Sequence, residues 1–205
     1  MLRCESRFDS TLRPRIRGAC LEVEIATPHN RDYVCRHRVT ADMNAIGTII
    51  RTAIGTALGD AAKVAYQTGS SITKGTANIG VAVIGEAPYA ETMGDVATQA
   101  ALTISTTDQN TVVALKTAGL KVVVVLVTGR PMLLPQSLVD SADAIVEAWL
   151  PGSEGDGVAD VLFGDYKPTG KLPHSWPATW AQIPINDGDP TYSPLYAYGF
   201  GLTYP

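Results

Sequence analysis

The stretch KVVVVLV at residues 121–127, followed by TGRP at 128–131, is the clearest secondary-structure signal in the chain. After its lysine it contains only valine and leucine, a composition typical of a strand that is buried on both faces of a parallel sheet. A second run of this kind, IGVAVI, occupies residues 79–84. Both runs have strand length, and neither approaches the roughly 18–20 apolar residues that a membrane-spanning helix needs.

Helix signals alternate with these strand signals. Residues 46–58 place apolar side chains on one helical face, and residues 106–118 open with Thr106 and Gln109, the spacing of a capping box. Weaker patterns predict strands at 63–66 and 143–149, and helices at 135–141 and 158–163. This alternation predicts an α/β fold: a doubly wound, mostly parallel sheet with helices on both faces, an α/β sandwich.

Binding and catalytic groups of such sheets lie in the loops beyond the carboxyl ends of the strands. This rule selects three segments, residues 85–95, 128–131 and 151–157. The third, PGSEGDG, matches neither G-x-G-x-x-G nor a P-loop, and its two acidic side chains would repel phosphate. We therefore interpret its glycines as turn residues and expect no nucleotide cofactor.

The first of these segments, GEAPYAETMGD, carries three carboxylates, Glu86, Glu91 and Asp95. A glycosidase needs one carboxyl group that is protonated and one that is ionised. Apolar neighbours such as Tyr89, or a second carboxylate, raise the pKa of a loop glutamate and suit it to the role of the acid. By composition alone, however, a loop glutamate is most often a solvated surface charge.

Ser71-Ile72-Thr73-Lys74 fits the S-x-x-K pattern of serine acyl-enzymes, which makes a weak esterase an alternative. The pattern is short, and the helix start that it requires is absent from the sequence pattern. No G-x-S-x-G elbow occurs anywhere in the chain.

Charge and residue type change abruptly along the chain. Residues 1–38 carry eight basic and five acidic side chains, whereas residues 39–205 carry eight basic and fifteen acidic ones. The first stretch shows no convincing helix or strand period, so we treat residues 1–42 as an atypical Arg/Cys-rich leader and residues 43–205 as the domain.

The net charge of −4 argues against nucleic acid as a partner. The expectation is a soluble chain without a signal peptide, of unknown compartment.

Three cysteines in the leader cannot form a fully paired disulfide framework. Cys35, His29 and His37 match no standard zinc spacing, so we expect no metal site.

Five motifs, taken in order, resemble the C-terminal α/β sandwich domain of family 3 glycoside hydrolases, in the β-glucosidase and β-glucan exohydrolase branch. These motifs are VAVIGEAPYAETMGD (81–95), VVVVLVTGRP (122–131), ADAIVEAWLPGSEGDGVADVLFGD (142–165), GKLPHSWP (170–177) and PLYAYGFGLTYP (194–205).

The resemblance implies a retaining enzyme in which a (β/α)8 barrel supplies the nucleophile and this domain lends the acid/base glutamate. The family motif places that glutamate at Glu91, with Glu86, Asp95 and Tyr89 in supporting positions. Arg130 matches a family arginine that the resemblance implies to be part of an ion pair.

The chain departs from the family pattern because it has no room for a barrel, which needs about 200 residues by itself. We therefore expect a β-glucoside or oligosaccharide substrate, a possible separate barrel partner and a homo-oligomer. The alternative is a non-catalytic sugar-binding or oligomerisation domain.

Overall fold

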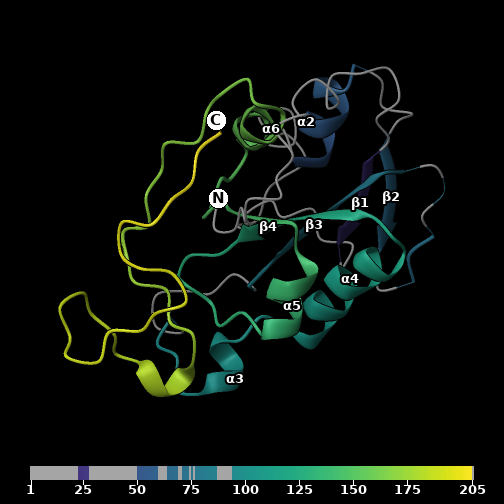
Figure 1. Cartoon of the computed structure of the whole chain (residues 1–205). Helices are drawn as coiled ribbons and strands as arrows, with labels where there is room; N and C mark the ends of the chain where they lie inside the picture. Colours follow the sequence, from purple (N-terminus) through teal and green to yellow (C-terminus); the bar gives the residue numbers. More distant parts are fainter. Residues whose placement is uncertain are drawn as a thin grey trace.

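The computed structural model describes residues 23–27, 50–59, 64–68, 71–73, 75, 77–86 and 94–204, and for 23–27 and 68 it describes the backbone alone. Within these ranges the chain forms a parallel sheet in the order β2-β1-β3-β4-β5 (Figure 1). The strands are β1 (Val23–Thr27), β2 (Val64–Thr68), β3 (Ile79–Gly85), β4 (Lys121–Val127) and β5 (Ala144–Glu147). The predicted α/β fold with a parallel sheet is confirmed.

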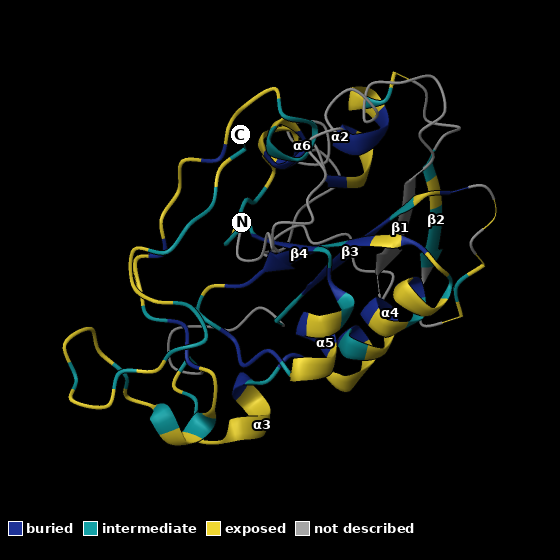
Figure 2. Cartoon of the chain, in the orientation of Figure 1, coloured by how far each residue is buried: buried dark blue, intermediate teal, exposed yellow. Residues whose placement is uncertain are grey.

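Both faces of this sheet are covered, because alternate side chains of β3 and β4 enter two separate cores. One core holds Ala82 and Ile84 of β3 with α4 (Thr106–Thr117) and α5 (Gln136–Ser141). The other holds Val81 and Val83 with α2 (Ile50–Ala57) and α6 (Gly155–Phe163). Figures 1 and 2 show the buried strands between these two layers of helices. This arrangement is the doubly wound sandwich that the sequence predicts.

Strand β1 lies within the stretch that the sequence pattern assigns to the atypical leader. Its backbone pairs in parallel with β2 on one side and β3 on the other, with Val23 opposite Val64 and Ile79. The predicted boundary between residues 42 and 43 therefore leaves a strand of the sheet on the leader side. Helix α3 (Gln99–Leu102), a single turn with Thr98 as its N-cap, also has no counterpart among the predicted elements.

The tail after α6 is irregular apart from the short 3-10 helix η4 (Trp180–Gln182). It is attached to the sandwich by Trp176, which is fully buried and donates its indole N–H to the Met132 carbonyl at 2.8 Å. Trp176 also contacts the rings of Trp149 and Tyr196 at centroid distances of 6.5 and 6.4 Å. No helix in the described part of the chain has the length and apolar character needed to cross a membrane.

Asp143 connects a helix and two strands at the amino end of the sheet. Its carboxylate accepts hydrogen bonds from Lys116 Nζ at 2.8 Å and from the Val122 N–H at 2.9 Å, and lies 3.4 Å from Lys121 Nζ. Burial pushes the pKa of Asp143 upward, but the bonds from Lys116 and Val122 and the two lysine charges outweigh it, so the pKa is lowered from 3.8.

A lowered pKa means that Asp143 stabilises the fold above its usual pKa of 3.8 and loses this contribution as the pH falls through its folded-state pKa. We expect Asp143→Asn to lower the free energy of unfolding at pH 7 by about 1 kcal/mol, with the difference from wild type vanishing in acid. Urea unfolding at a series of pH values measures this. Asp160→Asn, at an exposed position of α6, is the control. A difference that stayed constant into acid would contradict the prediction.

Gly85, the last residue of β3, lies opposite Val127 of β4. A Cβ at this position would lie 2.0 Å from the Val127 carbonyl oxygen, which is a backbone atom and cannot rotate away. By contrast, a Cβ at Gly157 in α6 would meet nothing within 4 Å.

We expect Gly85→Ala to lower the free energy of unfolding by about 3 kcal/mol or more, because the two strands must separate at their carboxyl ends. Gly157→Ala is the matched control and should leave stability unchanged or raise it by up to about 1 kcal/mol, since alanine favours a helix over glycine. Equal effects of the two substitutions, measured by thermal unfolding, would show that the close approach at Gly85 is not a constraint.

Candidate active site

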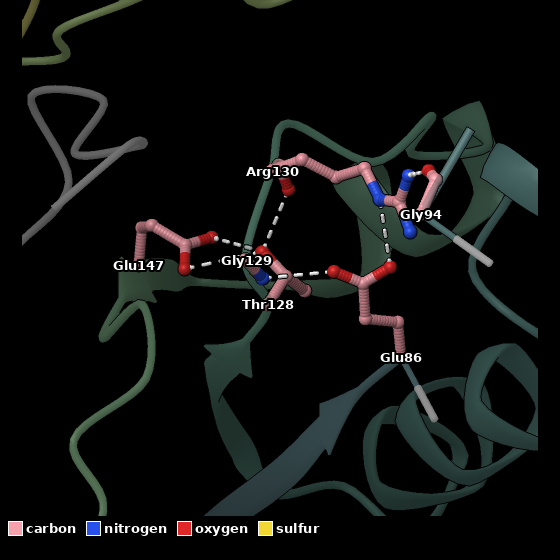
Figure 3. Close-up of polar contacts among 6 residues, drawn as sticks. All are labelled: Glu86, Gly94, Thr128, Gly129, Arg130 and Glu147. Carbon is pink, nitrogen blue, oxygen red and sulfur yellow. Dashed lines mark hydrogen bonds and ion pairs between the residues drawn. The ribbon is translucent and has the colours of Figure 1, made fainter. Parts of the chain in front are cut away.

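The carboxyl ends of three neighbouring strands meet at one edge of the sheet. Glu86 follows β3, Thr128 follows β4, and Glu147 is the last residue of β5. The side chains of Glu86 and Glu147 point from two sides toward the turn formed by residues 128–130 (Figure 3). The structure thus brings together groups from two of the three segments that the sheet rule selects.

Glu86 binds the turn through both of its carboxylate oxygens. Oε1 accepts the Gly129 backbone N–H at 2.8 Å, and Oε2 accepts Arg130 Nε at 2.9 Å (Figure 3). The side chains of Glu86 and Arg130 are 9% and 22% exposed, so the pair is largely shielded from water. Charge-assisted hydrogen bonds of this kind are about twice as strong as neutral ones.

Arg130 also makes a second contact, with Gly94. Its Nη1 donates a hydrogen bond to the Gly94 backbone carbonyl, while its Nε holds Glu86. One guanidinium group therefore binds the residue immediately before segment 87–93 and the residue immediately after it. Because a guanidinium is planar and rigid, it fixes the separation of these two points.

Glu147 approaches the turn from the opposite side. Thr128 is fully buried, and its Oγ1 lies 3.3 Å from each carboxyl oxygen of Glu147 and 2.8 Å from the Arg130 carbonyl. The Trp149 backbone N–H donates to Glu147 Oε1 at 2.8 Å. This bond accompanies a φ of 53° at Trp149, a left-handed conformation that is uncommon for a bulky residue.

Burial raises the pKa of Glu147 to about 8, although hydrogen bonds from Trp149 and Thr128 oppose the rise. Loss of hydration penalises the charged form of a carboxyl group. Burial thus favours the neutral form of Glu147, next to an ion pair that carries no net charge.

The structure describes some of the predicted site residues and not others. Glu86 and Arg130 are brought together as an ion pair, and Asp95 is exposed beside Gly94. Glu91 and Tyr89 lie outside the described residues, as do the cysteine and histidines of the leader.

Ser71 is exposed in the loop that follows the edge strand β2, and Lys74 of its pattern is outside the described ranges. No group of three His, Cys, Asp or Glu side chains among the described residues is placed to hold a metal ion.

Glu147 is a site residue that the sequence patterns do not select, whereas Thr128 lies in the selected segment 128–131. The predicted strand at 143–149 is apolar between Asp143 and Glu147, so Glu147 stands out as a charged residue near its carboxyl end. Such a residue either faces solvent or has a specific partner.

The fold and this network define the class of the chain: an α/β sandwich domain with a network of polar contacts at the carboxyl edge of its sheet. The model of the Glycosyl hydrolase family 3 C-terminal domain matches residues 36–204, and the chain belongs to this family. The match begins within the stretch that the sequence pattern assigns to the leader.

Similar proteins include a periplasmic beta-glucosidase from Salmonella typhimurium, 33% identical over 204 residues, covering 74% of this chain and 26% of the relative. A lysosomal beta glucosidase from Dictyostelium discoideum is 38% identical over 142 residues, covering 63% of this chain and 16% of the relative. Among solved structures, the exo-1,3/1,4-beta-glucanase from a Pseudoalteromonas species has a TM-score of 0.77 at 28% identity, covering 97% of this chain and 29% of the other. The chain thus spans about a quarter of the length of the first relative.

We expect Glu86→Gln to lower the free energy of unfolding by about 3 kcal/mol. The glutamine can still accept the Gly129 N–H, but its amide then faces the Arg130 Nε as a second donor and leaves a partly buried cation unpaired. Glu154→Gln makes the same chemical change at an exposed position and should cost little. Urea unfolding at pH 7 compares them, and similar losses for both variants would mean that the Glu86–Arg130 pair does not stabilise this edge.

Proposed function

We propose that this chain is the acid/base domain of a retaining glycosidase that acts on β-linked glucosides, with Glu91 as the group that protonates the leaving oxygen. The assignment of Glu91 comes from the family motif that residues 81–95 resemble. The substrate class is supported by relatives and a structural neighbour whose names are beta-glucosidase and beta-glucanase.

The observation that carries this proposal is the double anchorage of the segment around Glu91. Arg130 holds Glu86 before the segment and Gly94 after it, at the edge of the sheet where catalytic groups of α/β folds lie. A general acid must be held within hydrogen-bond reach of the oxygen that it protonates. Fixing both ends of a short segment restricts where its central residue can go, which suits this role.

The nucleophile of the proposed reaction comes from a barrel domain on another part of the assembled enzyme. The share of its relatives that this chain covers leaves room for such a domain. The substrate of the assembled enzyme would be a β-glucoside or an oligosaccharide. The homo-oligomer expected from the sequence remains a prediction.

The test combines the chain with the barrel domain of a family 3 beta-glucosidase and measures kcat/KM for aryl β-glucosides with leaving groups of graded acidity. Glu91→Gln should lower kcat/KM by about 10² to 10⁴-fold for poor leaving groups, because these need a proton. The loss should be much smaller for a dinitrophenyl glucoside, whose leaving group needs none. Asp160→Asn, an exposed acid on α6, is the control.

A loss in Glu91→Gln that is the same for every leaving group would contradict the role of general acid. Equal activity of Glu91→Gln and wild type would favour a domain that only binds sugar or mediates assembly. Turnover of aryl esters that Ser71→Ala abolishes would instead move the chemistry to the loop after β2.

A further inference from the structure

The hydrogen bonds around Thr128 cannot all be made by the Thr128 hydroxyl. Oγ1 has three oxygen neighbours: the Arg130 carbonyl at 2.8 Å and the two carboxyl oxygens of Glu147 at 3.3 Å. A hydroxyl carries one proton, and a carbonyl or a carboxylate can only accept. The carbonyl is the nearer acceptor, so it takes the hydroxyl proton. The contact with Glu147 then needs a proton from the carboxyl group.

We propose that Glu147 is a positioning residue that acts as a neutral carboxylic acid, donating a hydrogen bond to Thr128 Oγ1 and thereby holding the turn that carries Arg130. The chain of donors runs from the Glu147 carboxyl to the Thr128 hydroxyl and on to the Arg130 carbonyl. Its importance for catalysis rests on the proposed function of the segment around Glu91, whereas the chain of hydrogen bonds itself does not.

Both carboxyl oxygens of Glu147 lie 3.3 Å from Thr128 Oγ1, but one of them has a further partner, as suits a neutral acid. Oε1 accepts the Trp149 N–H at 2.8 Å, as the carbonyl oxygen of an acid does. This leaves Oε2 to carry the proton toward Thr128. Because the Trp149 N–H donates to Oε1, the two carboxyl oxygens of Glu147 are not equivalent.

Among the described residues, the charged groups on the segments next to Glu147 are either paired with each other or negative. Glu86, after β3, and Arg130, after β4, pair with each other at 2.9 Å. Glu154 and Asp156, at the start of α6, are exposed and have the same charge sign as an ionised Glu147. Burial, which raises the pKa of Glu147 to about 8, acts in the same direction.

A raised pKa gives a definite sign for the effect of pH. Glu147 contributes stability that is fully present below its usual pKa of 4.5 and is lost as the pH rises through about 8. Once ionised, the carboxylate competes for the Thr128 hydroxyl proton, and the Arg130 carbonyl loses its donor. The turn should therefore loosen on the alkaline side.

NMR on the full chain tests this without any substrate. Carboxyl ¹³C spectra, with the Glu147 resonance assigned by its loss in Glu147→Gln, should show a protonated group at pH 6.5 that titrates near 8. The Gly129 N–H donates a hydrogen bond to Glu86 Oε1 at 2.8 Å, so the hydrogen-exchange rate of this amide reports on how firmly the turn is held. At pH 6.5 its protection should be unchanged in Glu147→Gln, which retains a donor and an acceptor, and should fall about tenfold in Glu147→Met. Glu154→Gln is the matched control.

Two results would overturn the proposal. One is a Glu147 resonance that titrates at the usual value of a glutamate. The other is a Glu147→Gln variant in which the Gly129 amide loses protection relative to wild type. If the methionine variant does not fold, the wild-type titration and the glutamine variant still decide. Because neither measurement involves turnover, a failure here is distinct from a failure of Glu91 as the acid.

Discussion

The carboxyl ends of β3 and β4 approach so closely that no side chain fits between Gly85 and the Val127 carbonyl. Everything at the candidate site depends on this contact. It sets Glu86, the next residue of one strand, within reach of the Gly129 N–H and the Arg130 guanidinium after the other. A wider spacing would separate the ion pair and with it the anchor of the segment that follows Glu86.

The buried side chains at this edge carry almost no net charge. Glu86 and Arg130 cancel each other, and Glu147 is held mostly in its uncharged form. Burying a single charge without a partner costs several kcal/mol, whereas a paired charge or a neutral acid with its hydrogen bonds made costs far less. The edge can therefore hold fixed polar groups at a small cost in stability.

The central part of the fold could be predicted because its strands are continuous runs of apolar, mostly β-branched residues at 79–84 and 121–127. Strand β1 could not, since five residues without a convincing alternation, in a stretch rich in arginine, give no clear periodic signal. The pairing of Glu86 with Arg130 follows from the sequence only through the family resemblance, because the two are far apart in the chain. The contact of Thr128 with Glu147 depends on the register of β4 and β5, which sequence patterns do not give.

The position of β1 also bears on how the sheet is assembled. It lies between β2 and β3 yet precedes both in the chain, and its pairing with β3 joins residues farther apart than any other strand pairing in the described sheet. Contacts between distant residues form slowly, because the loop between them must close first. Strands β3, β4 and β5, by contrast, are neighbours both in the chain and in the sheet, so they can pair one after another. The half of the sheet that carries Glu86, Arg130 and Glu147 can thus form without β1, whereas β2 can join it only after β1 has been placed.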